Sequence, residues 1–154
     1  MASYNPYSNK YGNKSATPQP VAQTVTPVEK AGTPIPEDYV SVAESVITGL
    51  SKDRDGKLKL TTSKLRNLFG AYCDLYNEIA RQAGPLTSTQ KDALTVARIR
   101  IVYESGRDND VKSFVTNANL IEHLLWIGDS TENFIRFYHY FEALVAYHRY
   151  YGGK

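Results

Sequence analysis

Residues 131–151 carry the strongest structural signal in this chain, and they read Thr131-Glu132-Asn133-Phe134-Ile135-Arg136-Phe137-Tyr138-His139-Tyr140-Phe141-Glu142-Ala143-Leu144-Val145-Ala146-Tyr147-His148-Arg149-Tyr150-Tyr151. Apolar side chains recur here every three or four residues, which is the spacing of one face of an α-helix. The pattern predicts one long helix with a core stripe made of Phe134, Phe137, Tyr138, Phe141, Leu144, Val145 and His148.

A second stripe follows the opposite side of this predicted helix. It contains Arg136, Tyr140, Ala143, Tyr147 and Tyr150, so this side is too aromatic for an ordinary solvated face. We expect Tyr140 and Tyr147 to be offered to a neighbouring protein, as a candidate interface.

Helical spacing also extends upstream, with capping and turn residues between the helices. A hydroxyl residue among Thr61, Thr62 and Ser63 can cap a helix, and Thr87 with Gln90 has the spacing of a capping box. Helices are predicted over about 37–51, from this hydroxyl cap to about 82, over 88–105, from Asp110 to Gly128, and over 131–151. The sequence therefore predicts an all-α fold, a compact bundle of about five helices.

The predicted helix over 88–105 has apolar residues on two sides. Leu94, Ala97 and Ile101 form one stripe, while Val96, Ile99 and Tyr103 occupy the other side. We expect much of this helix to be buried.

Residues 1–36 differ in composition from the rest of the chain. They hold six of the seven prolines and few aliphatic residues, so they cannot bury enough apolar surface to order themselves. We predict a disordered tail over 1–36 and a helical domain over 37–154. The tail is either an inert extension or a Tyr- and Lys-containing arm that folds onto RNA or a partner.

Three features of the sequence indicate the cellular compartment of the protein. The single cysteine, Cys73, cannot form an internal disulfide, no export signal begins the chain, and no apolar run is long enough to span a bilayer. We expect a soluble cytoplasmic protein with no membrane partner.

Charge is distributed unevenly. The net charge is only +2, but residues 52–66 hold six basic side chains against two acidic ones. Lys64 and Arg66 flank the first turn of a predicted helix, where backbone N–H groups attract phosphate. Arg98 lies beside an apolar stripe, so it is either paired to an internal carboxylate or held ready for an anion at the surface.

Metal and catalytic patterns are weak. Asp53, Asp55 and Gly56 imitate part of a calcium-binding EF-hand loop, but Thr62 stands where the bidentate glutamate is required, so we prefer a solvated turn. His139 and Glu142 are three residues apart on one helix without the paired motif of a di-metal bundle. We interpret His148 as a core histidine, and we predict no catalytic residue, metal or cofactor.

Three blocks resemble the small subunit of the type III-A CRISPR-Cas effector, the Csm complex. They are Leu60 to Arg66, Val102 to Arg107, and Phe137 through Gly153. Their order and spacing cover nearly all of the predicted helical domain, whereas 1–36 has no counterpart in the resemblance.

The resemblance implies a non-catalytic helical subunit with RNA and protein partners. Such subunits stack in more than one copy along a ribonucleoprotein that carries the crRNA, and they touch the backbone and large subunits where guide and target RNA pair. The resemblance places RNA cleavage in the backbone subunit, and DNA cleavage and cyclic oligoadenylate synthesis in the large one.

Residue by residue, the resemblance carries helix-start and basic positions onto this sequence. The threonine-serine helix start falls on Thr61, Thr62 and Ser63, and His139 stands where some relatives have a stronger cation. The candidate RNA contacts are Lys64, Arg66, Arg98, Arg107 and Arg136. Two alternatives remain: a helical adaptor that binds only protein through Tyr140 and Tyr147, and a small metal-binding enzyme that uses His123, His139 and Glu142.

Overall fold

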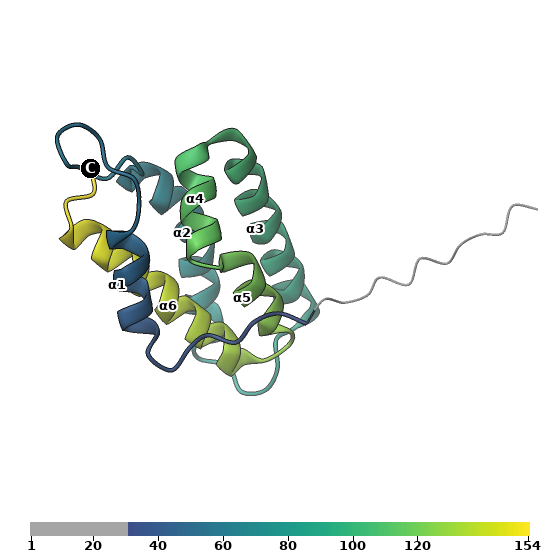
Figure 1. The fold of residues 1–154 in the computed structure, drawn as a ribbon. Coiled ribbons are helices and arrows are strands. Elements are labelled where there is room, and N and C mark those ends of the chain that lie inside the picture. The colour runs from purple at the N-terminus through teal and green to yellow at the C-terminus, as the bar shows by residue number, and fades with distance from the viewer. Residues whose placement is uncertain (1–30) are drawn as a thin grey trace, which may run out of the picture.

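Six helices make up the part of the chain that the computed structural model describes, residues 31–154 (Figure 1). An isolated antiparallel bridge joins Lys52 to Leu58, and no strand forms within these residues. The prediction of an all-α bundle is confirmed, with one helix more than expected. The helices are α1 (Tyr39–Thr48), α2 (Thr62–Ile79), α3 (Ser88–Arg107), α4 (Asn109–Asn117), α5 (Leu120–Ile127) and α6 (Thr131–Tyr150).

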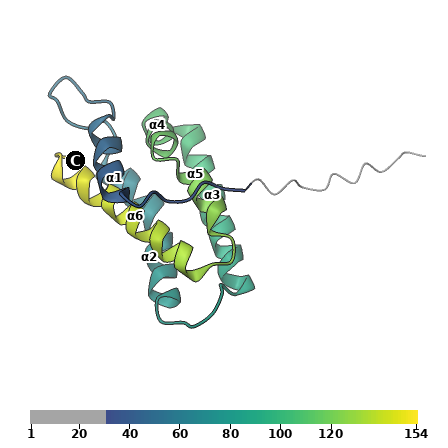
Figure 2. The ribbon, with the colours of Figure 1, turned by 60° about the horizontal axis from the view of Figure 1, so that its bottom comes forward.

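Helix α6 lies at the centre of the bundle. It packs against α1, α2 and α5, and Figures 1 and 2 show these helices gathered around it. Phe134, Phe137 and Phe141 have no exposed surface, and the ring of Phe141 lies 5.0 Å from that of Phe69 in α2. The predicted core stripe of this helix is therefore confirmed.

Local capping chemistry starts most of the helices. Thr61 accepts a hydrogen bond from the backbone N–H of Lys64, and Thr87 forms the predicted reciprocal capping box with Gln90. Helix α4 departs from expectation, because Asp108 rather than Asp110 is its cap. Asp108 accepts two backbone N–H groups, which anchors the start of α4 earlier in the chain than expected.

The predicted helix over 110–128 is broken in two. Asn119 adopts the left-handed conformation, with φ of 53°, and separates α4 from α5. The break leaves the backbone carbonyl of Ala118 outside a helix, and the hydroxyl of Tyr140 donates a hydrogen bond to it at 3.0 Å. Tyr140 is only 1% exposed. Its predicted role in a protein interface is therefore wrong, since this side chain is used to close the α4–α5 junction.

The exposure of the outer face of α3 also differs from the prediction. Val96, Ile99 and Tyr103 were expected to be buried, but they are 65%, 61% and 61% exposed. Helix α3 packs against α2, α4 and α5 through its other side, where Ala97 and Ile101 are buried. Nothing in the described chain covers the outer face.

An ordered segment precedes α1, and the sequence did not predict it. Residues 31–36, assigned to the tail, run along α5 instead. The backbone N–H of Thr33 donates to the carbonyl of Glu122 at 3.0 Å, and Nδ1 of His123 donates to the carbonyl of Thr33 at 2.7 Å. Gly32 lies so close to α5 that an added Cβ would meet the backbone N of Trp126 at 2.0 Å. The rest of the predicted tail, 1–30, lies outside the described residues.

Replacing Tyr140 with Phe should lower the free energy of unfolding by about 1 to 3 kcal/mol, because it leaves the buried carbonyl of Ala118 without a partner. Urea unfolding followed by circular dichroism measures this change. Tyr147→Phe is the matched control, since the Tyr147 hydroxyl makes no hydrogen bond within residues 31–154, and it should stay within about 0.5 kcal/mol of wild type. Equal effects of the two variants would contradict the role given to Tyr140.

Replacing Gly32 with Ala should destabilise the domain by about 1 to 3 kcal/mol, because the new methyl group clashes with the α5 backbone. Thermal unfolding measures the loss, and hydrogen exchange at the Thr33 amide reports whether 31–36 has detached. Gly70→Ala is the control: its Cβ enters open space in α2, and it should be neutral or stabilise by roughly 0.5 to 1 kcal/mol. An unchanged Gly32→Ala variant would contradict the docking of this segment.

Candidate nucleic-acid interface

Cations from distant parts of the sequence gather at one end of the bundle. Nζ of Lys64, in the first turn of α2, lies 2.5 Å from Oδ2 of Asp108, which caps α4 directly after Arg107 ends α3. Nζ of Lys154 lies 3.7 Å from Oδ2 of Asp53 in the loop between α1 and α2. The start of α2, the α3–α4 junction and this loop all lie in the upper part of Figure 1. We call the set the basic end: Lys52, Arg54, Lys57, Lys59, Lys64, Arg66, Arg107 and Lys154.

The loop between α1 and α2 is held by Asp53. Its Oδ1 accepts the backbone N–H groups of Asp55 and Lys57, each at 2.9 Å, and the bridge between Lys52 and Leu58 closes the loop. The hydrogen bond from the Lys57 backbone lowers the pKa of Asp53 below its ordinary value. Leu58 points into the core, while Lys52, Arg54, Lys57 and Lys59 are exposed. This arrangement is the exposed, solvated turn that the sequence predicts.

Lys64 and Arg66 differ in how far they are engaged within the chain. The hydrogen bond from Lys64 lowers the pKa of Asp108, and the backbone N–H of Val111 adds to the effect. Part of the Lys64 charge is therefore compensated at the α4 cap. Arg66 is exposed and makes no ion pair in the part of the chain that the structure describes. Of the two, Arg66 is the side chain less engaged within the described chain.

Arg107 is exposed at the end of α3, where its guanidinium contacts an aromatic ring and a carboxylate. Its guanidinium carbon lies 5.4 Å from the centre of the Tyr103 ring, and its Nη1 lies 3.5 Å from Oε1 of Glu104. Surface contacts of this kind are weak, so the guanidinium can exchange them for a phosphate.

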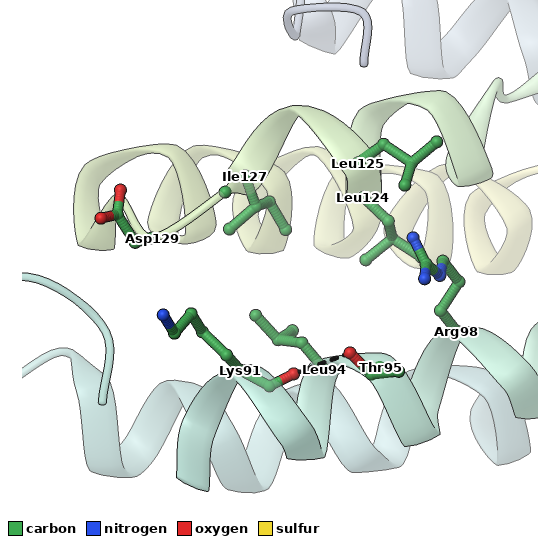
Figure 3. Close-up of a pocket in the computed structure, with 9 residues that line it drawn as sticks. Lys91, Leu94, Thr95, Arg98, Leu124, Leu125, Ile127 and Asp129 are labelled. Carbon is green, nitrogen blue, oxygen red and sulfur yellow. Dashed lines mark hydrogen bonds between the residues drawn. The ribbon is translucent and has the colours of Figure 1, made fainter. Parts of the chain in front are cut away.

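Arg98 stands apart from the basic end. It lies nine residues before Arg107 on the same helix, which corresponds to about 13 Å along the axis. It makes no ion pair within residues 31–154, so of its two interpretations the structure favours a cation held at the surface over a buried pair. Figure 3 shows Arg98 beside a cavity of about 540 Å³ between α3 and α5. The cavity is lined by Lys91, Leu94, Thr95, Arg98, Leu124, Leu125, Ile127, Gly128 and Asp129.

Arg136 is engaged inside the domain. Its Nη2 donates to the carbonyl of Pro36 at 2.9 Å, and its guanidinium carbon lies 5.5 Å from the centre of the Tyr39 ring. This half-buried side chain fastens the start of α1 to α6. The structure therefore does not bring Arg136 together with Lys64, Arg66 and Arg107.

The three histidine rings contact other groups within the domain. Nε2 of His148 lies 2.7 Å from the carbonyl of Leu60, and the ring is buried, which confirms His148 as a core histidine. Burial lowers the pKa of His123, whose ring meets Tyr140 edge-on. His139 lies against the ring of Tyr76. Among residues 31–154, no three His, Cys, Asp or Glu side chains are grouped so that they could hold a metal ion.

The sequence pattern indicates only part of the basic end. Lys52, Arg54, Lys57 and Lys59 belong to the basic run of the sequence, but charge excess alone did not single them out as contacts. Lys154 lies far beyond that run, so no local pattern links it to Asp53.

Within residues 31–154, no helix is both long and apolar enough to cross a membrane.

Comparison with known proteins gives consistent matches. A family model described as Csm2 Type III-A matches residues 37–154. The chain is 45% identical over 117 residues to the CRISPR system Cms protein Csm2 of Mycobacterium tuberculosis (strain CDC 1551 / Oshkosh), covering 75% of this chain and 93% of the relative. The protein of the same name from Streptococcus thermophilus is 39% identical over 119 residues, with 77% and 94% covered. That from Enterococcus italicus is 33% identical over 95 residues, with 60% and 68% covered.

The lowered pKa of Asp108 predicts a loss of stability in acid. Because the folded-state pKa lies below the ordinary value of about 3.9, the contribution is present above that pH and is lost as the pH falls through the lowered pKa. Between roughly pH 5 and pH 2, Asp108→Asn should therefore lose less stability than wild type. Urea unfolding midpoints measure this, with Asp92→Asn at an exposed site on α3 as the control. Identical pH profiles for all three proteins would contradict the assignment.

Proposed function

The chain belongs to the Csm2 type III-A family of CRISPR system proteins, and we propose that it is the non-catalytic small subunit of a type III-A RNA-guided interference complex. The family that the sequence predicted is thereby confirmed. In the proposed role the subunit binds the backbone of crRNA and target RNA, bridges the backbone and large subunits, and stacks with further copies of itself. This activity would serve antiviral defence in the cytoplasm.

The basic end is the observation that supports RNA as the ligand. Its loop cations, Arg66 and Arg107 are all exposed, and they lie in the loop between α1 and α2, in the first turns of α2 and at the end of α3. Charge neutralisation of phosphates contributes most of sequence-independent affinity. A subunit that must accept any guide and target suits this mode, because base readout would restrict which sequences are recognised.

The proposed contacts follow the geometry. Lys64 and Arg66 in the first turns of α2 lie near the α3–α4 junction that follows Arg107, and the loop cations precede α2 in the chain. Arg98 offers a separate contact at the groove between α3 and α5. Arg136 is the weakest of the five candidates, because it already holds Pro36 and Tyr39.

A non-catalytic role is supported by how the histidines are used. His123 and His148 are buried and bonded to backbone carbonyls of Thr33 and Leu60, so their ring nitrogens serve the fold. A general base must reach a substrate proton, and these two rings are not placed at the surface to do so.

A protein-only adaptor is the second candidate, and the exposed apolar face of α3 favours it. Val96, Ile99 and Tyr103 are suited to a protein neighbour rather than to phosphates. The two functions are compatible, since the basic end and the outer face of α3 are different surfaces. Charge reversal at the basic end distinguishes the two functions, because it should weaken RNA binding without changing a protein contact at α3.

Reversing Arg66 or Arg107 to Glu should weaken retention of target RNA by the assembled complex. Each variant should lower the slope of log affinity against log salt concentration by about 1, because one phosphate contact is lost. RNA of several unrelated sequences should be affected alike. Filter binding at a series of salt concentrations measures both quantities.

Arg81→Glu provides the matched control, since it carries the same charge change at an exposed position just beyond the far end of α2. It should bind RNA like wild type, and thermal unfolding should show all three variants folded. Unchanged RNA affinity and salt dependence in both Arg66→Glu and Arg107→Glu would refute RNA binding at the basic end and leave the adaptor as the better description.

A further inference from the structure

The cavity between α3 and α5, which we call the α3–α5 groove, combines buried apolar side chains with cations. Leu94, Leu124 and Ile127 are buried along it, and Lys91 and Arg98 line it from α3. Figure 3 shows Arg98 extending from α3 toward Leu124. Neither cation makes an ion pair within residues 31–154. The groove therefore suits an occupant that carries an apolar side chain beside a carboxylate.

The segment 31–36 leads toward this groove. The backbone N–H of Thr33 donates to the carbonyl of Glu122 at 3.0 Å, and a Cβ added at Gly32 would meet the carbonyl carbon of Leu125 at 2.6 Å. Leu125 is also one of the residues that line the groove. Figures 1 and 2 both show the segment crossing α5 toward α3. The residues that precede it in the chain therefore start beside the groove.

The sequence just before this segment has the composition that the groove requires. Residues 27–30 read Pro27-Val28-Glu29-Lys30, and Glu29 is the only carboxylate among residues 1–36. Val28, directly before it, supplies an apolar side chain. An extended chain spans at most about 3.6 Å per residue, so Val28 lies within about 14 Å of Gly32. Because Gly32 already contacts a residue of the groove wall, this reach is sufficient to enter the groove.

We propose that residues 27–30 of this chain dock in the α3–α5 groove, with Val28 against the apolar side chains and Glu29 paired to Arg98. Lys91 lies two turns before Arg98 on α3, so a carboxylate between them is attracted by both cations. Docking covers Arg98, which is one of the proposed RNA contacts. The segment and a phosphate group therefore compete for this guanidinium, and docking acts as an autoinhibitory contact at Arg98.

Disulfide trapping in the full-length subunit tests where the segment lies. Pro27→Cys is combined with Thr95→Cys, at an exposed position that lines the groove, in a Cys73→Ser background that removes the native thiol. The matched control pairs Pro27→Cys with Val96→Cys, the next residue of α3, which is 65% exposed on the outer face. Under mild oxidation the Thr95 pair should close at least about tenfold faster, because docking raises the effective concentration of its two thiols.

Charge reversal tests the pairing of Glu29 with Arg98. Glu29→Arg and Arg98→Glu should each slow closure of the Thr95 pair by about threefold to tenfold, because like charges then face each other. Combining the two substitutions should restore the rate, since opposite charges meet again. Arg100→Glu makes the same charge change at an exposed position of α3 that does not line the groove, so it should leave the rate unchanged.

Three results would overturn the proposal. Equal closure rates for the Thr95 and Val96 pairs would show that the segment does not favour the groove. A rate that rises with protein concentration would show that a second copy supplies the segment. A combined Glu29→Arg and Arg98→Glu variant that stays slow would refute the pairing of these two side chains. The measurements contain no RNA, so their failure leaves RNA binding at the basic end standing, and failure of RNA binding leaves the docking standing.

Discussion

The rings of Phe137 and Phe141 in α6 meet the rings of Tyr72 and Phe69 in α2 at centroid distances of 5.0 to 5.6 Å. Rings of this size contribute the largest buried areas in a small domain, so the contact fixes how α2 lies across α6. Helices α1 and α5 then occupy the remaining sides of α6. The ends of α2, α3 and α4 are thereby brought together, and the basic end is a result of that aromatic packing.

Local chemistry made much of the fold predictable, and tertiary fit decided the rest. The capping box at Thr87 and the core stripe of α6 depend on neighbours within a few residues, so the sequence contains them. The break at Asn119 has no proline or glycine to announce it, and it is stabilised by Tyr140, which is distant in sequence. Apolar residues on both sides of α3 could not reveal which side would find a neighbour.

The candidate interface was predictable to a similar degree. A local excess of positive charge along the sequence is enough to identify the region of Lys64 and Arg66. From the sequence alone, Arg136 looks like an ordinary surface cation. Residue spacing does not show that 31–36 return along α5 and α6 to contact it. Lys154 escapes sequence reasoning for the opposite reason, since its neighbour Asp53 lies near the other end of the helical domain.

The contact between Arg107 and Tyr103 joins the exposed apolar side of α3 to the basic end, because Tyr103 belongs to the first and Arg107 to the second. A protein neighbour that docks on this side of α3 would restrict the Tyr103 ring and, with it, the guanidinium proposed to hold a phosphate. Ordering imposed by that neighbour need not be repeated when RNA arrives, so the two binding events would be thermodynamically linked.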